Sequence, residues 1–258
     1  MAKIALIAGT AESLRNFRGP LVEALLDRGH QVHALAPDPD TATLEWLNER
    51  GVTFHEIALN RTGLNPVRDI KTVWQIYRCL TSVKPDACIS YTIKPVIYGT
   101  LAAFLARVPK RAAMITGLGY AFIEDDGGYK RRLTKLVAST LYKLALARAY
   151  RVVFQNPDDR AYFLNHRLVR EPAKTAIVNG SGVDVSHFGN VALPGIPVFL
   201  LIARLLKDKG IHEYIAAARL VRTALPDGRF LLAGPEDVSP NAIDQAVLRE
   251  AEGDGTID

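Results

Sequence analysis

The sequence predicts an α/β protein whose parallel sheets are covered by helices on both faces. Short apolar runs alternate with longer amphipathic segments along nearly all of its 258 residues, and such alternation with short connections is typical of parallel βαβ units. The alternation stops between residues 186 and 197, where Gly and Pro occur without periodicity, and then starts again. We therefore expect two domains, 1–190 and 191–258.

The elements of the first domain are predicted from apolar runs of four to six residues and from helical segments bounded by Gly or Pro. We expect strands at 3–8, 31–36, 53–57, 87–91, 111–116, 151–155 and 175–178, and helices at 17–28, 41–50, 66–83, 95–106, 129–149 and 158–165. In helix 66–83, the helical period predicts one buried face made of Val67, Ile70, Val73, Trp74, Tyr77 and Leu80.

The second domain starts with strand 198–203, helix 210–225, strand 229–233 and helix 242–252. Two βα units are fewer than a doubly wound domain needs, and they would leave sheet edges uncovered. We therefore expect this chain to hold only the beginning of that domain.

Composition narrows the class of protein. Apolar residues make up 48% and charged residues 23%, which excludes a disordered chain, and no apolar run is long enough to cross a bilayer. The first apolar run leads directly into charged residues, so we interpret it as a buried strand and not as a signal peptide. Cys79 and Cys88 lack metal-ligand spacing, and we expect two inert thiols in a cytoplasmic protein.

The net charge of +5 is unevenly distributed. Residues 128–174 carry a local balance of +8, whereas residues 236–258 carry −6. The basic part would attract phosphates, anionic lipid or nucleic acid. No nucleic-acid motif and no interleaved aromatic residues accompany it, so we expect no nucleic-acid partner.

Ligands of parallel α/β sheets bind at the carboxyl ends of strands, beside the amides of helix N-termini. The segment after the first strand is neither a Gly-x-Gly-x-x-Gly fingerprint nor a Walker loop, which argues against nicotinamide and P-loop sites. It offers Gly9 for close approach and Arg15 and Arg18 for anions, or else a turn with two solvated arginines. Two later loops, 117–119 and 179–184, are rich in Gly and small polar residues and fit either a ligand loop or a plain turn.

The segment Ala203–Gly210 joins a buried strand to a helix. Arg204 and Lys209 would lie beside the positive end of that helix, an arrangement that suits a diphosphate leaving group. The alternative is a solvated loop of lysines. Gly234 follows the next strand and is a weaker candidate for the edge of a nucleotide site.

Six stretches in this order resemble glycosyltransferase family 4, in particular its bacterial branch that acts on polyprenyl-diphosphate-linked glycans. The resemblance covers nearly the whole chain and lies in residues 16–18 (NFR), 92–99 (TIKPVIYG), 115–120 (ITGLGY), 154–159 (FQNPDD), 180–184 (GSGVD) and 203–210 (ARLLKDKG).

The resemblance implies a GT-B fold, a complete N-terminal Rossmann-like domain for the acceptor and a second such domain for the donor. It also implies metal-independent, retaining transfer from a nucleotide-diphosphate sugar as co-substrate, with no other cofactor. Residues 191–258 would be the partial donor domain. The family's later Glu-x7-Glu element has no counterpart here, so we expect a fragment lacking about 100–130 residues that binds donor poorly.

Carried over residue by residue, the resemblance implies three groups of site residues. The donor diphosphate would meet Arg204, Lys209 and Gly210, and the acceptor would meet Asn16, Arg18 and Lys94. Glu124 is a weak candidate for the base. The loops of the cleft would contain Gly9, Thr10, Gly117, Gly119, Gly180, Ser181, Gly182 and Gly234.

The basic helix 129–149 places lysines and arginines among leucines, a pattern that fits either docking on the inner face of an anionic membrane beside a lipid-linked acceptor, or a core helix with a solvated face. Two other functions stay open. A GT-B sugar-nucleotide epimerase would share the fold, and a non-catalytic acceptor-binding remnant would lack donor binding.

Overall fold

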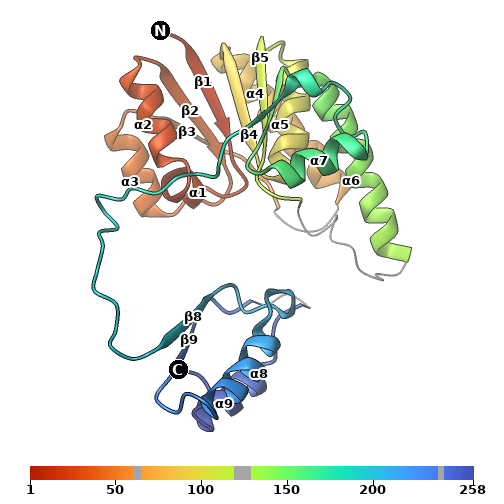
Figure 1. The fold of residues 1–258 in the computed structure, drawn as a ribbon. Helices are drawn as coiled ribbons and strands as arrows, with labels where there is room; N and C mark the ends of the chain where they lie inside the picture. Colours follow the sequence, from red (N-terminus) through yellow and green to blue (C-terminus); the bar gives the residue numbers. More distant parts are fainter. Residues whose placement is uncertain (61–64, 119–128, 238–240) are drawn as a thin grey trace. The chain divides into compact units, whose positions relative to one another are not determined.

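The computed structural model describes residues 1–60, 65–118, 129–237 and 241–258 (Figure 1), with the backbone alone for 129–134. The chain divides into two compact units, Met1–Val183 and Asp184–Asp258, and each is described by itself. The predicted domain boundary at 190/191 lies in irregular chain beyond this division.

In the described part of the first unit, seven parallel strands form one sheet in the order β3-β2-β1-β4-β5-β6-β7. The predicted α/β class with a parallel sheet is confirmed. The strands are β1 (Lys3–Ile7), β2 (Gln31–Ala36), β3 (Thr53–Glu56), β4 (Ala87–Tyr91), β5 (Lys110–Ile115), β6 (Arg151–Phe154) and β7 (Thr175–Ile177).

Helices cover both faces of this sheet because its strands are apolar at successive positions (Figure 1). Alternate residues of β1 enter two separate cores: Ile4 and Leu6 on one side, Ala5 and Ile7 on the other. The first core is completed by α1 (Glu12–Asn16), α2 (Gly19–Asp27) and α3 (Thr41–Glu49), and the second by α4 (Pro66–Val83), α5 (Ile93–Leu105), α6 (Tyr129–Arg148) and α7 (Pro157–Asn165).

The buried face predicted for α4 is wrong in part. Val67, Ile70 and Trp74 are exposed, by 79%, 70% and 53%. Leu80 is buried and Val73 and Tyr77 are half-buried, as predicted, but the other buried residues of the helix are Thr72 and Ile76. The sequence contains two neighbouring apolar rows, and the helical period cannot choose between them. Packing against α5 decides, together with the Thr72 hydroxyl, which donates to the carbonyl of Ala58 at 2.5 Å.

Two predicted helix starts also differ from the structure. The helix expected at 17–28 is two helices, α1 and α2, that meet at Phe17 and Arg18. Pro20 lies in the first turn of α2, where its missing N–H costs nothing, so a new helix begins there. The helix expected at 242–252 begins at Gln245 as α9 (Gln245–Gly253), because Ala242 pairs with Leu206 in a β-bridge.

The second unit contains a parallel pair of strands, β8 (Val198–Ile202) and β9 (Arg229–Ala233). The helices α8 (Ile211–Arg222) and α9 pack on one side of this pair, around Ile215, Phe230 and Leu248. Leu200 and Ile202 of β8 are exposed, by 54% and 73%. None of the helices within the described ranges combines the length and the apolarity needed to span a membrane.

Candidate functional site

The first candidate site lies where the strand order of the large sheet reverses. The chain runs outward from β1 to β3 and then returns to β4 on the other side of β1. The carboxyl ends of β1 and β4 are therefore neighbours, and the loops after them diverge from this point. Such a switch point opens a crevice, which is where parallel α/β sheets bind their ligands.

Gly9 and Thr92 come after these two strands and lie in contact. A Cβ added to Gly9 would stand 2.7 Å from Oγ1 of Thr92, so the loops can approach this closely only because residue 9 is glycine. Thr92 has φ +67° and ψ 160°, a conformation that costs a branched residue about 1–3 kcal/mol and is found mainly at functional sites. It precedes α5, whose first amides receive no bond from its side chain.

Arg18 extends from the junction of α1 and α2 over the end of β4. Its side chain is buried, with 6% exposed, and its guanidinium lies 4.9 Å from the centre of the Tyr91 ring. Tyr91 is itself buried and bonds Ser13 at 2.9 Å between hydroxyl oxygens. Burial lowers the pKa of Arg18 and raises that of Tyr91 to about 12. The possibility that Arg18 is a solvated arginine is therefore excluded.

The loop after β7 meets Arg18 through Ser181. Nη1 of Arg18 donates to Oγ of Ser181 at 2.7 Å, and Gln155, which comes directly after β6, donates to the same oxygen at 3.4 Å. Gly180 and Gly182 have φ of +72° and +75°, which glycine adopts without strain. The structure thus brings two predicted groups, Arg18 and the 180–182 loop, to one place.

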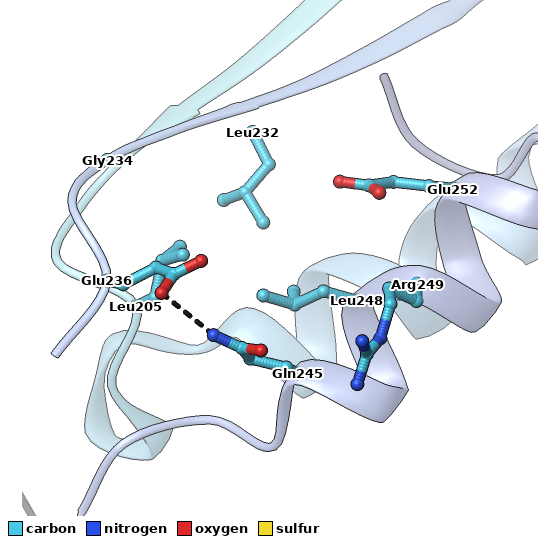
Figure 2. A pocket seen from close by; sticks show the side chains of 8 residues that line it. All are labelled: Leu205, Leu232, Gly234, Glu236, Gln245, Leu248, Arg249 and Glu252. Carbon is cyan, nitrogen blue, oxygen red and sulfur yellow. Dashed lines mark hydrogen bonds between the residues drawn. The ribbon is translucent and has the colours of Figure 1, made fainter. Parts of the chain in front are cut away.

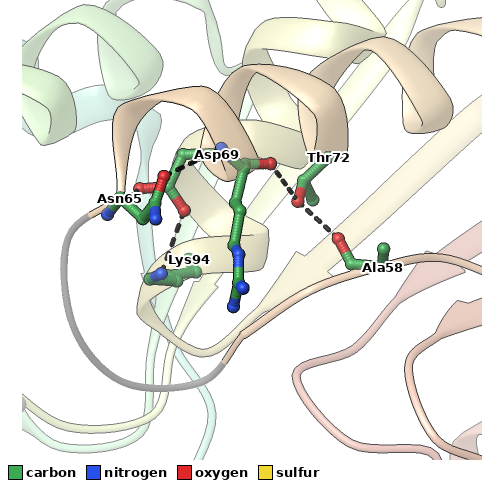
Figure 3. Close-up of polar contacts among 6 residues, drawn as sticks. Ala58, Asn65, Asp69, Thr72 and Lys94 are labelled. Carbon is green, nitrogen blue, oxygen red and sulfur yellow. Dashed lines mark hydrogen bonds and ion pairs between the residues drawn. The ribbon is translucent and has the colours of Figure 1, made fainter.

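Lys94 is placed differently. It lies in the first turn of α5 and its Nζ is 3.0 Å from Oδ1 of Asp69, in an ion pair whose side chains are only 10% and 14% exposed. Figure 3 shows Asp69 between Lys94 and the cap of α4, where the backbone N–H of Asn65 also donates to the Asp69 carboxylate. The charge of Lys94 is neutralised by a neighbouring helix.

The remaining predicted residues of the first unit are scattered or lie outside the described residues. Thr10 accepts a bond from the Ser13 hydroxyl through its carbonyl, and Asn16 is exposed and bonded to Glu12. Gly117 lies after β5 with φ +147°. Gly119 and the base candidate Glu124 lie outside the described residues.

The second candidate site is at the carboxyl ends of β8 and β9. Arg204 lies after β8, and its Nη1 is 3.2 Å from Oδ2 of Asp237 in a pair whose arginine is 60% exposed. Lys209 ends a short 3-10 turn, η3 (Lys207–Lys209), with its Nζ 3.5 Å from Oδ2 of Asp208. Gly210, at φ +77°, leads into α8 without capping its first amides by a side chain. Two cations and open helix amides therefore share one loop.

A cavity of about 320 Å³ adjoins this loop (Figure 2). Gly234 forms part of its wall and is obligatory, because a Cβ there would lie 1.7 Å from the carbonyl oxygen of Ala203. Glu236 and Gln245 bond across the opening at 2.8 Å. The other lining residues are Leu205, Leu232, Leu248, Arg249 and Glu252. The cavity is of a size to take part of a small polar ligand.

The described residues contain neither a candidate metal site nor a reactive thiol. No cluster of three or more His, Cys, Asp or Glu side chains there could hold an ion. Burial raises the pKa of Cys79 to about 11 and that of Cys88 to about 12, so both thiols stay protonated and unreactive.

Sequence reasoning missed three residues of these sites. Tyr91 and Thr92 lie at the carboxyl end of β4, and the rule that ligands bind at such strand ends could have found them. Ser13 bonds Tyr91, and the sequence contains no signal for that contact. Asp237 lies in the candidate stretch 234–237 after β9, but its ion pair with Arg204 could not be predicted.

Comparison with known proteins agrees with this picture. The family model of the glycosyl transferase 4-like domain matches residues 16–180. The chain is 27% identical over 253 residues to N,N'-diacetylbacillosaminyl-diphospho-undecaprenol α-1,3-N-acetylgalactosaminyltransferase of Campylobacter jejuni, covering 93% of this chain and 65% of that protein. It is 26% identical over 186 residues to UDP-Gal:α-D-GlcNAc-diphosphoundecaprenol α-1,3-galactosyltransferase of Escherichia coli, covering 67% and 46%. The chain thus spans less than two thirds of these relatives.

Solved structures share the fold. A glycosyltransferase from Rickettsia africae superposes with a TM-score of 0.66 at 15% identity, over 98% of this chain and 65% of that one. UDP-GlcNAc 2-epimerase from Methanocaldococcus jannaschii superposes with a TM-score of 0.57 at 15% identity, over 97% of this chain and 68% of that one. These neighbours agree with the GT-B class expected from the resemblance. Since the family model matches more than half of its length, the chain belongs to the family of glycosyl transferase 4-like domains.

Proposed function

We propose that this protein transfers a sugar, with retention of configuration, from a nucleotide-diphosphate donor to a lipid-linked glycan in the biosynthesis of a surface polysaccharide or glycan. One observation carries the donor side: Arg204, Lys209 and the amides at the start of α8 meet in the loop after β8. The names of the two relatives, which include a UDP-Gal donor and diphospho-undecaprenol acceptors, support both substrate classes.

The proposed chemistry centres on the leaving group. The bond from the anomeric carbon to the donor diphosphate breaks, and the acceptor hydroxyl forms a new bond to that carbon on the same face. The acceptor proton passes to an oxygen of the departing diphosphate, so no separate protein base is required. Arg204 and Lys209 stabilise the negative charge that develops there, and the helix amides add to it.

The existing partners of these cations are compatible with this role. Arg204 is 60% exposed, and an exposed ion pair contributes at most about 1 kcal/mol. A diphosphate carries more charge than Asp237 and accepts hydrogen bonds in pairs from a guanidinium. It can therefore replace Asp237 at little cost.

The acceptor side is proposed for the first unit, at the crevice between β1 and β4. Gly9 permits close approach there, and Arg18 and the 180–182 loop supply polar contacts. Lys94 would need to leave Asp69 to take part. We keep Asn16 and Lys94 as weaker members of this site.

Membrane contact is proposed through α6. Its outer face exposes Leu136 (64%) and Leu144 (54%), with Lys143 exposed between them, while Tyr142 and Leu146 are buried. A basic surface with exposed leucines fits the interface of an anionic bilayer. Sedimentation with vesicles tests this: we expect more pelleting with anionic than with neutral vesicles, and less when Leu144 and Lys143 are replaced by Ser. Equal pelleting on both vesicles would contradict it.

The main test concerns the diphosphate loop, in the protein with a complete donor domain. Arg204→Ala and Lys209→Ala should each lower turnover by about 100-fold or more, since each removes a charge contact made in the transition state. Lys207→Ala, in the same turn, is the matched control and should stay near normal. Normal turnover in both test variants would refute the assignment.

Two alternatives make different predictions in the same assays. An epimerase, which shares the fold, would convert the donor when no acceptor is present, so product analysis with donor alone separates it from a transferase. A non-catalytic acceptor-binding protein would bind no nucleotide sugar while remaining folded, which titration of the 258-residue chain would reveal.

A further inference from the structure

Arg18 differs from the other three cations that the resemblance assigns to these sites. Lys94, Arg204 and Lys209 each lie within 3.5 Å of a carboxylate oxygen. Arg18 is the most buried of the four, yet among the described residues it has no acidic partner: its contacts are a carbonyl, a hydroxyl and the face of an aromatic ring. No carboxylate of the described residues compensates its positive charge.

The hydrogen bonds of Arg18 leave one side of its guanidinium, that of Nε and Nη2, without a partner among the described residues. Nη1 donates to the carbonyl of Phe17 at 3.3 Å and to the Ser181 hydroxyl at 2.7 Å. Nε is buried and has no partner, and no bond joins Nη2 to a described residue. A guanidinium has five N–H groups in a fixed plane. The Nε–H and the adjacent Nη2–H are parallel, and together they form the fork that receives two oxygens of a carboxylate or phosphate.

An open fork of this kind is costly to maintain. A buried donor without an acceptor costs about 1–3 kcal/mol, and more when the group is charged. Buried arginines in folded proteins are therefore almost always paired. A structural role would be served as well by a neutral side chain or a nearby acid, so the unpaired fork indicates an anion that the described residues do not supply.

The surroundings of Arg18 fit a phosphoryl group. Its guanidinium is held against the ring of Tyr91, the last residue of β4. The next residue, Thr92, precedes α5 with a strained backbone, and its side chain does not cap the first helix amides. The positive end of α5 and the cation of Arg18 are thus at the same end of β4, at the reversal of strand order. Helix amides together with an arginine fork are the usual receptor for phosphate.

We propose that Arg18 binds a phosphoryl group of the lipid diphosphate that carries the acceptor glycan, through its Nε–Nη2 fork. This deepens, and rests on, the acceptor-side assignment made above. Two diphosphates take part in the proposed reaction, and the donor's is assigned to the second unit. The acceptor's diphosphate is therefore assigned to the first unit. All contacts of Arg18 are with residues of that unit. Arg18 is a binding residue here and takes no part in bond breaking.

Direct binding tests the proposal. The probe is farnesyl diphosphate, titrated by calorimetry into the 258-residue chain carrying Arg204→Ala and Lys209→Ala, so that the second candidate diphosphate site is disabled. Adding Arg18→Gln should weaken binding about 10- to 100-fold, as expected for lost hydrogen bonds to a charged group. Arg18→Lys should weaken it similarly, because lysine keeps the charge but not the fork. Arg28→Gln, at the exposed end of α2, is the charge-matched control and should change affinity by less than about twofold.

Further probes identify the source of the phosphoryl group. Farnesol, which lacks phosphate, should bind equally with and without Arg18→Gln, and inorganic pyrophosphate should show the same dependence on Arg18 as farnesyl diphosphate. UDP binding to the chain with Arg204 and Lys209 intact should not change in Arg18→Gln. Loss of UDP binding with farnesyl diphosphate unaffected would overturn the assignment to the acceptor. The site itself would be overturned if Arg18→Gln left the affinity for every probe unchanged. It would also be overturned if farnesyl diphosphate did not bind at all.

Stability separates binding from a structural role. Removing an unpaired buried charge should leave the thermal midpoint of Arg18→Gln equal to or above that of the unchanged chain, whereas a drop of several degrees would show that Arg18 supports the fold and would overturn the proposal. The transfer assay distinguishes this inference from the proposed function. If Arg18→Gln transfers sugar with an unchanged KM for the acceptor, the inference about Arg18 is wrong but the proposed function stands. If the protein transfers no sugar but its binding of diphosphate depends on Arg18, only the proposed function is wrong.

Discussion

The contact between Gly9 and Thr92 gives a sharp prediction about the crevice of the large sheet. In Gly9→Ala, the new methyl group would lie 2.7 Å from Oγ1 of Thr92, where ordinary contacts begin at 3.4 Å. The hydroxyl cannot turn away freely, because threonine is branched at Cβ and is held here at φ +67°. We expect this overpacking to lower the free energy of unfolding by about 1–3 kcal/mol.

A double-mutant cycle isolates the cause of that loss. Thr92→Gly removes the hydroxyl and relieves a backbone strain of about 1–3 kcal/mol, so it should be neutral or stabilising. In its background Gly9→Ala should cost little, since the next atom outside residue 92, Cγ of Pro95, is 3.8 Å away. The coupling free energy between the two sites should be about 1 kcal/mol or more.

Urea unfolding followed by tryptophan fluorescence measures this cycle, because both tryptophans, Trp46 and Trp74, belong to the first unit. Gly19→Ala is the control: its methyl would meet Trp46 at 3.4 Å, an ordinary contact, and should change stability by no more than about 0.5 kcal/mol. An equal cost of Gly9→Ala in the unchanged chain and in the Thr92→Gly background would refute the reasoning.

Two further predictions concern polar groups of the first unit. Lys94→Met or Asp69→Leu alone should destabilise the unit by about 3–5 kcal/mol, because each leaves a buried charge unpaired. The double variant with both substitutions should recover most of that loss in the same urea assay. A loss in the double variant equal to the sum of the singles would contradict this. His33 and His55 lie 3.1 Å apart, ring nitrogen to ring nitrogen, and burial lowers the pKa of each below 6.5. The unfolded chain then binds more protons, so the stability they contribute is complete above pH 6.5 and is lost as the pH falls through their folded pKa values. Thermal midpoints between about pH 7.5 and 5 should fall less steeply in a variant with Gln at both positions, and an unchanged slope would exclude the pair as the cause.

Most of the fold could be predicted because its signals are local. Apolar runs, terminal glycines and prolines such as Pro66 locate nearly every strand and helix of the large sheet, and βαβ alternation fixes its parallel direction. The inward face of α4 could not be predicted, because neighbouring rows compete and packing against α5, the helix after β4, decides between them. The same holds for the start of α9, which is delayed by a bridge between Ala242 and Leu206.

The sequence predicted where in the fold the candidate sites lie, but not which side chains contact one another there. The rule that ligands bind at the carboxyl ends of strands led to Gly9, Arg18 and Arg204 without any coordinates. Which carboxylates lie nearby depends on contacts between distant residues, such as the one between Lys94 and Asp69. No local pattern encodes these contacts, so the sequence could not tell a neutralised cation from an open one.

That difference changes how the predicted cations should be weighed. An exposed pair such as Arg204 with Asp237 contributes little to stability, so the exchange of the carboxylate for the proposed diphosphate would require little free energy. A buried pair such as Lys94 with Asp69 resists exchange, because opening it would strand two charges away from water. Arg18 follows neither pattern: it is desolvated by burial and has gained no ion pair among the described residues. An incoming anion there displaces no carboxylate, so its full interaction with the guanidinium appears as binding affinity. Replacing Arg18 by Gln should therefore weaken ligand binding without lowering the stability of the first unit.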